Sequence, residues 1–253
     1  MNRTWFRRFT AAKGDGPLLV CFPHAGGSAA AYVELARALS AEFDVVSVQY
    51  PGRQDRFAEA PFTALGPLVE AVAGELADGP ARDHGRPYAL FGHSMGALVA
   101  FETARLLVRD GLPAPMRLFL SGRGGPLCHS GDVDKPWDDA EVLADLHRLG
   151  GTDRTMLEDP DVLEMVLPAL RADYRAVATY RWTGGEPLAV PVTALIGDRD
   201  PMVTVGEAQM WGEHTSGDFA LKVFGGGHFY LTDRIGQVAA AVGEGLLAGT
   251  PSA

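Results

Sequence analysis

The chain has 253 residues, of which 47% are hydrophobic and 21% charged, a composition that excludes disordered, collagen-like and coiled-coil proteins. It carries 22 basic against 32 acidic side chains, and this net charge of −10 argues against a nucleic-acid-binding protein. Two cysteines are too few for a disulfide scaffold, and no apolar run reaches the roughly 18 residues of a membrane span or forms the core of a signal peptide. We therefore expect a single cytoplasmic domain over residues 1–253, with no membrane partner.

Short apolar runs alternate with helical patterns through the first half of the chain. The runs predict strands at 18–22, 45–49, 88–91 and 116–121. Apolar residues at steps of three and four, with Gly and Pro between them, predict helices at 29–39, 65–76 and 96–109. Alternation of this kind is typical of βαβ units, so we expect an α/β fold with a mostly parallel sheet and helices on both faces.

Residues 122–187 interrupt this alternation, because they contain no convincing strand and begin with a Gly-rich segment. Asp138 and Glu141 resemble the capping pair of a helix that continues to residue 149, and Asp159 with Pro160 begins a second helix, to about residue 180. We expect a helical insertion that covers the carboxyl ends of the strands, where open α/β sheets bind ligands.

The alternation resumes after the insertion. A strand is predicted at 192–196, followed by a helix capped by Thr204 and Glu207, a strand at 219–224 and a last helix at 233–247.

Residues 92–96 read Gly-His-Ser-Met-Gly and lie between a predicted strand and a predicted helix. Gly-x-Ser-x-Gly in this context is typical of a sharp turn that lifts a serine hydroxyl out of the sheet, with glycines where a Cβ would collide with neighbouring backbone. The following helix directs its free N–H groups at the negative charge that develops in acyl transfer. The pattern predicts Ser94 as a nucleophile.

A serine nucleophile needs a base that accepts its proton. His228 follows the predicted strand 219–224 through three glycines, a run that can lift an imidazole over the strand end. His93 is excluded, because the residue before the nucleophile should point away from its hydroxyl. We therefore predict His228 as the base.

The base in turn needs an acid that orients it, and the chain order Ser, Asp, His is the one this architecture uses. Asp198 and Asp200 both follow the predicted strand 192–196. The spacing alone leaves the two open.

The oxyanion hole of such a site takes one N–H group from the residue after the nucleophile and one from the loop after an early strand. Residues 22–28 form that loop, and their paired glycines allow the backbone to approach a substrate. Ala25 and Met95 are the predicted donors. We expect no metal site and no cofactor, because the sequence has neither a convincing cluster of metal ligands nor a phosphate-binding Gly-x-x-x-x-Gly-Lys motif.

Seven segments together resemble the type II thioesterases of polyketide and nonribosomal peptide synthesis, which are free-standing α/β-hydrolases. They are FPHAGGS (22–28), YPGRQDR (50–56), FGHSMGAL (91–98), SGR (121–123), LRADY (170–174), GDRDP (197–201) and GGHFYL (226–231). The resemblance implies that Asp200, and not Asp198, completes a triad with Ser94 and His228. It also implies that residues 122–187 are a mobile lid.

The same resemblance implies a function in antibiotic biosynthesis, the hydrolysis of stalled acyl groups from the phosphopantetheine arm of acyl or peptidyl carrier proteins. The phosphopantetheine belongs to the substrate. Carrier proteins are usually acidic, so this acidic chain would need a local basic patch for docking, which we expect near the lid. The alternatives are a carboxylesterase or lipase, an acyltransferase with the same triad, and a binding protein with a relict site.

Overall fold

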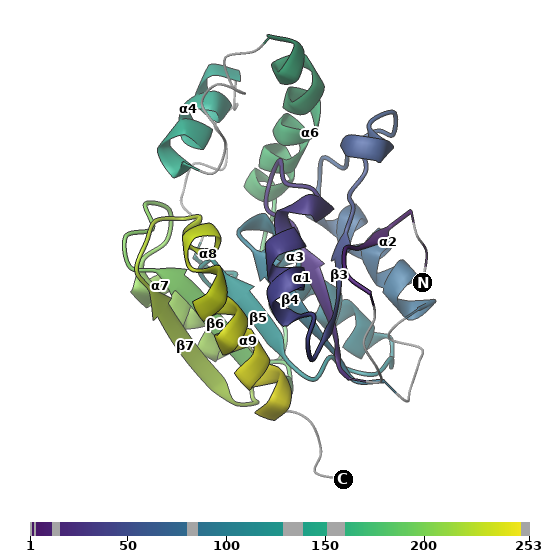
Figure 1. Cartoon of the computed structure of the whole chain (residues 1–253), viewed down its shortest axis with the longest axis vertical. Helices are drawn as coiled ribbons and strands as arrows, with labels where there is room; N and C mark the ends of the chain where they lie inside the picture. The colour runs from purple at the N-terminus through teal and green to yellow at the C-terminus, as the bar shows by residue number, and fades with distance from the viewer. Residues whose placement is uncertain are drawn as a thin grey trace.

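The computed structural model describes residues 2, 4–11, 16–79, 86–128, 139–150 and 160–248. At its centre is a seven-stranded sheet with the strand order β1-β3-β2-β4-β5-β6-β7 (Figure 1). The strands are β1 (Phe6–Arg8), β2 (Leu18–Phe22), β3 (Asp44–Val48), β4 (Tyr88–His93), β5 (Leu118–Ser121), β6 (Val192–Gly197) and β7 (Phe219–Phe224). All neighbours pair in parallel except β1, which is antiparallel to β3, so the prediction of a mostly parallel sheet is confirmed.

Helices cover both faces of the sheet. They are α1 (Val33–Leu39), α2 (Leu65–Ala77), α3 (Met95–Arg109), α4 (Asp139–Leu149), α6 (Pro160–Ala178), α7 (Val205–Gln209), α8 (Tyr230–Asp233) and α9 (Ile235–Ala248). Helices α2 and α3 pack on one face, and α1 and α9 on the other. No helix within the described part of the chain has the length and apolar character needed to cross a membrane.

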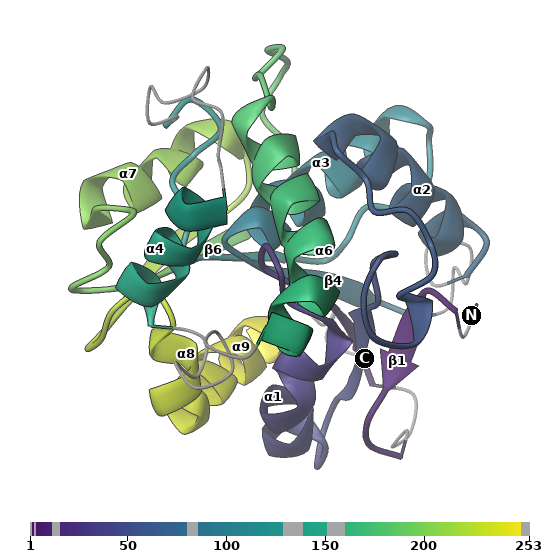
Figure 2. The same ribbon diagram turned by 90° about the horizontal axis from the view of Figure 1, so that it is seen from above.

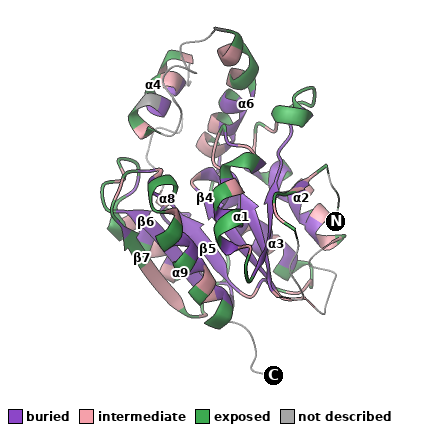
Figure 3. Cartoon of the chain, viewed as in Figure 1, coloured by how far each residue is buried: buried purple, intermediate pink, exposed green. Residues whose placement is uncertain are grey.

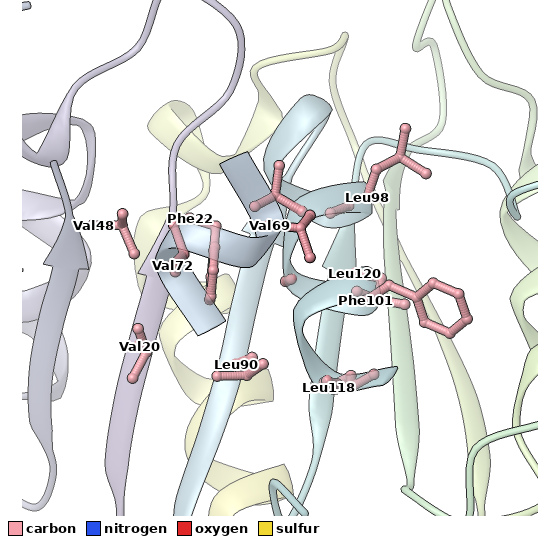
Figure 4. Packing of buried hydrophobic residues seen from close by; sticks show 14 of the residues in the cluster. Val20, Phe22, Val48, Val69, Val72, Leu90, Leu98, Phe101, Leu118 and Leu120 are labelled. Atoms are coloured by element: carbon pink, nitrogen blue, oxygen red, sulfur yellow. The ribbon is translucent and has the colours of Figure 1, made fainter. Parts of the chain in front are cut away.

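The central strands are buried on both faces, because alternate side chains of each strand face opposite helix layers. In β2, Val20 and Phe22 face α2 and α3, whereas Leu19 and Cys21 face α1 and α9. Figure 4 shows Val20 and Phe22 in the first of these layers. The buried sheet between half-exposed helices (Figure 3) holds the carboxyl ends of its strands in fixed positions, and these ends carry the predicted site.

The prediction differs from the structure at short elements. Strand β1 was not predicted, since three residues show no periodicity. The helix predicted at 29–39 begins as a 3-10 turn (Ala29–Tyr32). The last helix, predicted at 233–247, is confirmed as α9, and the short α8 before it was not predicted. The predicted cap of α7 is confirmed, because Thr204 and Glu207 form a reciprocal capping box. The predicted caps at Asp138 and Asp159 lie outside the described residues.

The predicted insertion at 122–187 contains α4 and α6, and its described residues form no strand. Both helices stand beyond one end of the sheet (Figure 1), and from above α6 lies between α4 and α2 (Figure 2). This is the carboxyl end, because the Asp173 side chain of α6 accepts a hydrogen bond from Gly26, just after β2.

Candidate active site

Ser94 lies on a strained turn between β4 and α3. Its φ of 55° and ψ of −117° are unusual for a residue with a side chain. A Cβ on Gly92 would lie 2.1 Å from the Gly96 carbonyl oxygen, and one on Gly96 would lie 2.0 Å from that of Phe22. Only glycine fits at these two positions, which is the steric reason for the motif. The turn leaves Ser94 half-buried between two buried residues.

Asp200 and His228 meet beyond the ends of β6 and β7. The His228 Nδ1–H donates to the Asp200 Oδ2 at 2.8 Å, and the Met202 N–H donates to the Asp200 Oδ1 at 2.8 Å. Both side chains of the pair are buried. Since Nδ1 carries the proton toward the carboxylate, the His228 Nε2 has a free lone pair and can accept a proton.

Asp198 points to a different partner. Its Oδ1 accepts a hydrogen bond from the Gly226 N–H at 2.8 Å, and this bond is the main reason that the pKa of its carboxyl is lowered. The contact joins the turn after β6 to the glycine turn after β7. Asp198 therefore helps to hold the loop that carries His228, and Asp200 contacts the ring itself.

The His228 ring lies above the serine turn between β4 and α3. Its centroid is 4.9 Å from that of His93, the residue before Ser94. Within the described residues no hydrogen bond joins the Ser94 hydroxyl to the His228 ring. In unliganded enzymes such bonds are often long and tighten only when substrate is bound.

His93 points away from the elbow and into the protein. Its Nδ1 is 2.9 Å from the Ser121 hydroxyl, which is 2.7 Å from the Tyr230 hydroxyl. Burial lowers the pKa of His93 well below its usual range, and the nearby His228 and His24 rings contribute. The side chain is therefore a neutral, buried part of the scaffold.

In the loop after β2, some backbone N–H groups have a hydrogen-bond acceptor and one has none among the described residues. The Gly27 N–H donates to the His24 carbonyl oxygen at 2.9 Å, and the Gly26 N–H donates to the Asp173 Oδ2 at 2.8 Å. The Ala25 N–H has no acceptor among the described residues. The Met95 N–H is at the start of α3, where a helix provides no acceptor. The two donors named from the sequence are thus free to bind a substrate oxygen.

His24 belongs to the same loop and was not singled out from the sequence. Its ring packs edge-on against Phe229, with centroids 4.9 Å apart. Burial lowers its pKa to about 4, with smaller contributions from the neighbouring His228 and Arg53 side chains. The side chain is thus neutral near pH 7 and adds no charge to the site.

Sequence reasoning also missed a buried ion pair beside the loop. Arg53 Nη1 and Nη2 donate to the Asp173 Oδ2 and Oδ1 at 2.7 and 3.0 Å, and both side chains are under 10% exposed. The two residues belong to segments 50–56 and 170–174, which carried the family resemblance without a role for either charge. A charged residue within such a segment is the signal that could have found them.

A cavity of about 560 Å³ lies elsewhere, between α2, α3 and residues 179–183. Within its lining, Arg105 donates to Glu102 at 2.8 Å, and the Tyr180 hydroxyl donates to Glu102 at 2.6 Å. It contains none of the residues named above. In the described part of the chain, no group of three His, Cys, Asp or Glu side chains could hold a metal ion.

The carboxyl ends of the strands carry a serine turn, a buried Asp–His pair and two free N–H groups. This arrangement agrees with the comparison to known proteins. The thioesterase domain family matches residues 17–245. The chain belongs to this family. It is therefore a hydrolase that acts on thioesters, and the predicted α/β-hydrolase fold is confirmed by solved structures of relatives.

The similar proteins include enzymes of polyketide and nonribosomal peptide clusters. The chain is 43% identical to thioesterase PikA5 of Streptomyces venezuelae, over 98% of this chain and 88% of that one. It is 44% identical to the type II thioesterase BorB of the borrelidin cluster, with a TM-score of 0.85 and coverage of 96% and 98%. For YbtT, the type II thioesterase of the yersiniabactin pathway, identity is 30%, the TM-score 0.87 and coverage 98% and 100%.

Proposed function

We propose that the protein is a type II thioesterase that removes acyl groups from the phosphopantetheine arm of acyl or peptidyl carrier proteins. In this proposal Ser94 is the nucleophile, His228 the base and Asp200 the acid that orients it. Ala25 and Met95 provide the oxyanion hole. The observation that supports these roles best is the buried hydrogen bond between Asp200 and His228, which leaves Nε2 free above the serine turn.

The reaction follows from these positions. The Ser94 Oγ attacks the thioester carbonyl carbon as its proton passes to the His228 Nε2, and the carbonyl oxygen becomes an oxyanion bound by the Ala25 and Met95 N–H groups. The C–S bond then breaks, and the thiolate leaves and takes up the proton from the imidazolium. A water molecule, deprotonated by His228, attacks the acyl-serine. The carboxylic acid is released and Ser94 regains its proton.

A thioester suits this site because a thiolate is a good leaving group. His228 has only to activate Ser94 and then water, and its one hydrogen bond to Asp200 fixes the ring in the tautomer for both steps. The carrier protein as partner is supported by relatives in polyketide and nonribosomal peptide clusters that match nearly the full length of this chain. The chemistry needs no cofactor beyond the phosphopantetheine of the substrate.

The test is an intact-mass assay on an acyl carrier protein loaded with a short panel of acyl groups. The wild type should return the free phosphopantetheine form of the carrier. Ser94→Ala should lower turnover by at least about 10³-fold and keep the wild-type melting temperature, because the replaced side chain is small and half-buried. Preference for a soluble oxygen ester over the acylated carrier would instead favour a carboxylesterase.

A fluorophosphonate probe provides a second readout. It should label the wild type at Ser94 and leave Ser94→Ala unlabelled. A wild type that is not labelled and hydrolyses no thioester would be a binding protein with a relict site.

A further inference from the structure

The loop that would form half of the oxyanion hole is held from outside by two side chains. Gly26 has a φ of +74°, and its N–H donates to the Asp173 Oδ2 at 2.8 Å. The carbonyl oxygen of the following residue, Gly27, accepts from the Arg53 Nη1 at 3.0 Å. The bond to the Gly26 N–H fixes the peptide plane between Ala25 and Gly26, and the bond to the Gly27 carbonyl oxygen fixes the plane that follows Gly27.

Arg53 and Asp173 are themselves fixed. They form a two-pronged ion pair, and the Arg53 Nε donates in addition to the Pro51 carbonyl oxygen at 3.2 Å. The Arg53 carbonyl oxygen accepts from the Gln49 side chain, whose Oε1 accepts from the Ala29 N–H at 3.0 Å. The network therefore holds both ends of the loop between β2 and the first helical turn.

Asp173 lies on α6, in the predicted insertion, and α6 also packs directly on the loop. A Cβ built on Gly26 would lie 2.6 Å from the Leu170 Cδ1, so the Leu170 side chain lies directly against the loop. Asp173 is 147 residues from Gly26 along the chain. Contacts from a distant part of the chain therefore support the loop.

Stability alone is a weak reason for this ion pair. The cost of removing two charges from water often equals or exceeds their attraction, and apolar replacement of a buried pair is frequently neutral or stabilising. What an apolar pair cannot supply is an acceptor for the Gly26 N–H and a donor for the Gly27 carbonyl oxygen. These two hydrogen bonds point to a role in positioning the loop.

We propose that Asp173 and Arg53 are positioning residues, which hold residues 25–27 so that the Ala25 N–H faces the thioester oxygen, and which complete the oxyanion hole only when α6 is seated. The proposal rests on the proposed function, because it presumes Ser94 attack and an oxyanion bound by Ala25. Neither side chain touches the substrate. Their effect passes through the backbone of Gly26 and Gly27.

The double variant Arg53→Met/Asp173→Leu separates positioning from stability. Both charges are replaced by apolar side chains, so its melting temperature should lie within a few degrees of the wild type. Its kcat on a soluble acyl thioester should fall by about 10- to 100-fold, since loss or displacement of an oxyanion donor has effects of this order. The KM should change by less than about threefold, because the hole acts on the transition state and not on the bound substrate.

Two further measurements identify the oxyanion hole as the affected part. The affinity for a trifluoromethyl ketone, which forms a tetrahedral oxyanion with the serine, should fall by the same factor as kcat/KM. Asp173→Asn keeps a side-chain oxygen for the Gly26 N–H and should retain more kcat than Asp173→Leu. Should the double variant fail to fold, the Asn variant carries the same comparison.

The control is a second ion pair of the same helix. Arg171 of α6 pairs with Asp139 of α4, both side chains are exposed, and within the described residues no hydrogen bond joins either of them to the loop. Arg171→Met/Asp139→Leu should keep kcat within about twofold, as expected for an exposed pair.

The outcomes are distinct. Wild-type kcat and inhibitor affinity in a folded Arg53→Met/Asp173→Leu enzyme would overturn the positioning role and leave the proposed function intact. An equal loss of kcat in the Arg171/Asp139 control would also overturn it, because seating of α6 in general, and not these two hydrogen bonds, would then matter. A Ser94→Ala enzyme that still hydrolyses the thioester would instead overturn the proposed function.

Discussion

The serine turn and helix α6 both contribute to the candidate active site, but the first is held by local contacts and the second by long-range contacts. The turn is a local structure. Ser94 lies between Gly92, which packs against the first turn of α3, and Gly96, which packs against the end of the neighbouring β2. Helix α6 is placed by contacts between residues far apart in the chain, of which the pair of Arg53 and Asp173 is buried. The nucleophile is therefore specified by the local sequence, whereas the shape of the loop after β2 depends on tertiary contacts from three segments.

The catalytic pair gives the largest expected effect. Asp200→Asn should lower kcat by about 10³- to 10⁴-fold with little loss of stability, because an amide favours the wrong tautomer of His228. Asp198→Asn is the matched control, two residues away on the same turn. Its kcat should stay within about fivefold of the wild type, because an amide oxygen can still accept the hydrogen bond from the Gly226 N–H. Steady-state kinetics of both variants checks this, and the reverse order of effects would exchange the roles of the two aspartates.

The steric account of the turn is tested by adding a methyl group. Gly96→Ala would place a Cβ 2.0 Å from the Phe22 carbonyl oxygen, a backbone atom of a buried strand that cannot move aside. We expect a loss of at least about 2 kcal/mol in the free energy of unfolding. Gly66→Ala in α2 meets nothing within 4 Å and should stabilise the protein by about 0.5–1 kcal/mol.

Denaturant titration of both variants measures these changes. A Gly96→Ala protein as stable as the wild type would show that the turn has room for a side chain, and the glycine motif would then need another explanation.

The next effect is a dependence of stability on pH at His24. Its pKa is about 4 in the folded protein against 6.5 in the unfolded chain, so between these values the unfolded state binds more protons. Stability from this group is therefore present above about pH 6.5 and is lost as the pH falls toward 4, by up to about 2–3 kcal/mol. His24→Gln removes this contribution and should flatten the profile by that amount.

Denaturant titrations of both proteins between pH 7.5 and 4.5 test the prediction. The backbone hydrogen bond from Gly27 to the carbonyl oxygen of residue 24 remains in the variant. Parallel profiles for wild type and His24→Gln would show that the ring does not stay neutral in the folded state.

Most strands and helices could be predicted from the sequence, because the alternation of apolar runs and helical patterns recurs along the chain. Strand β7 was predicted with its observed bounds, 219–224, since apolar runs between turn residues are a local signal. Strand β1 was not, because three residues at the edge of a sheet depend on pairing with β3 and not on their own pattern.

The site could be predicted only in part, because local patterns do not show which distant residues meet. Ser94 and His228 stand beside glycines that mark tight turns, but Asp198 and Asp200 are equally placed on the strand end. The folded turn decides between them: Asp198 reaches Gly226 and Asp200 reaches His228. The pair of Arg53 and Asp173 joins residues 120 positions apart, which no local pattern encodes.

The smallest expected effect is at the helix cap that the sequence did predict. The Thr204 hydroxyl accepts from the Glu207 N–H at 3.2 Å, and the Glu207 Oε2 accepts from the Thr204 N–H at 2.8 Å. Thr204→Ala should lower the free energy of unfolding by about 1 kcal/mol and leave kcat unchanged. Thr232→Ala in α8, another exposed threonine, is the control and should change stability by less than about 0.5 kcal/mol. A change in kcat in Thr204→Ala would mean that this local cap affects the site as the distant contacts of α6 do, through the Glu207 carbonyl oxygen, which accepts from the Gly125 N–H.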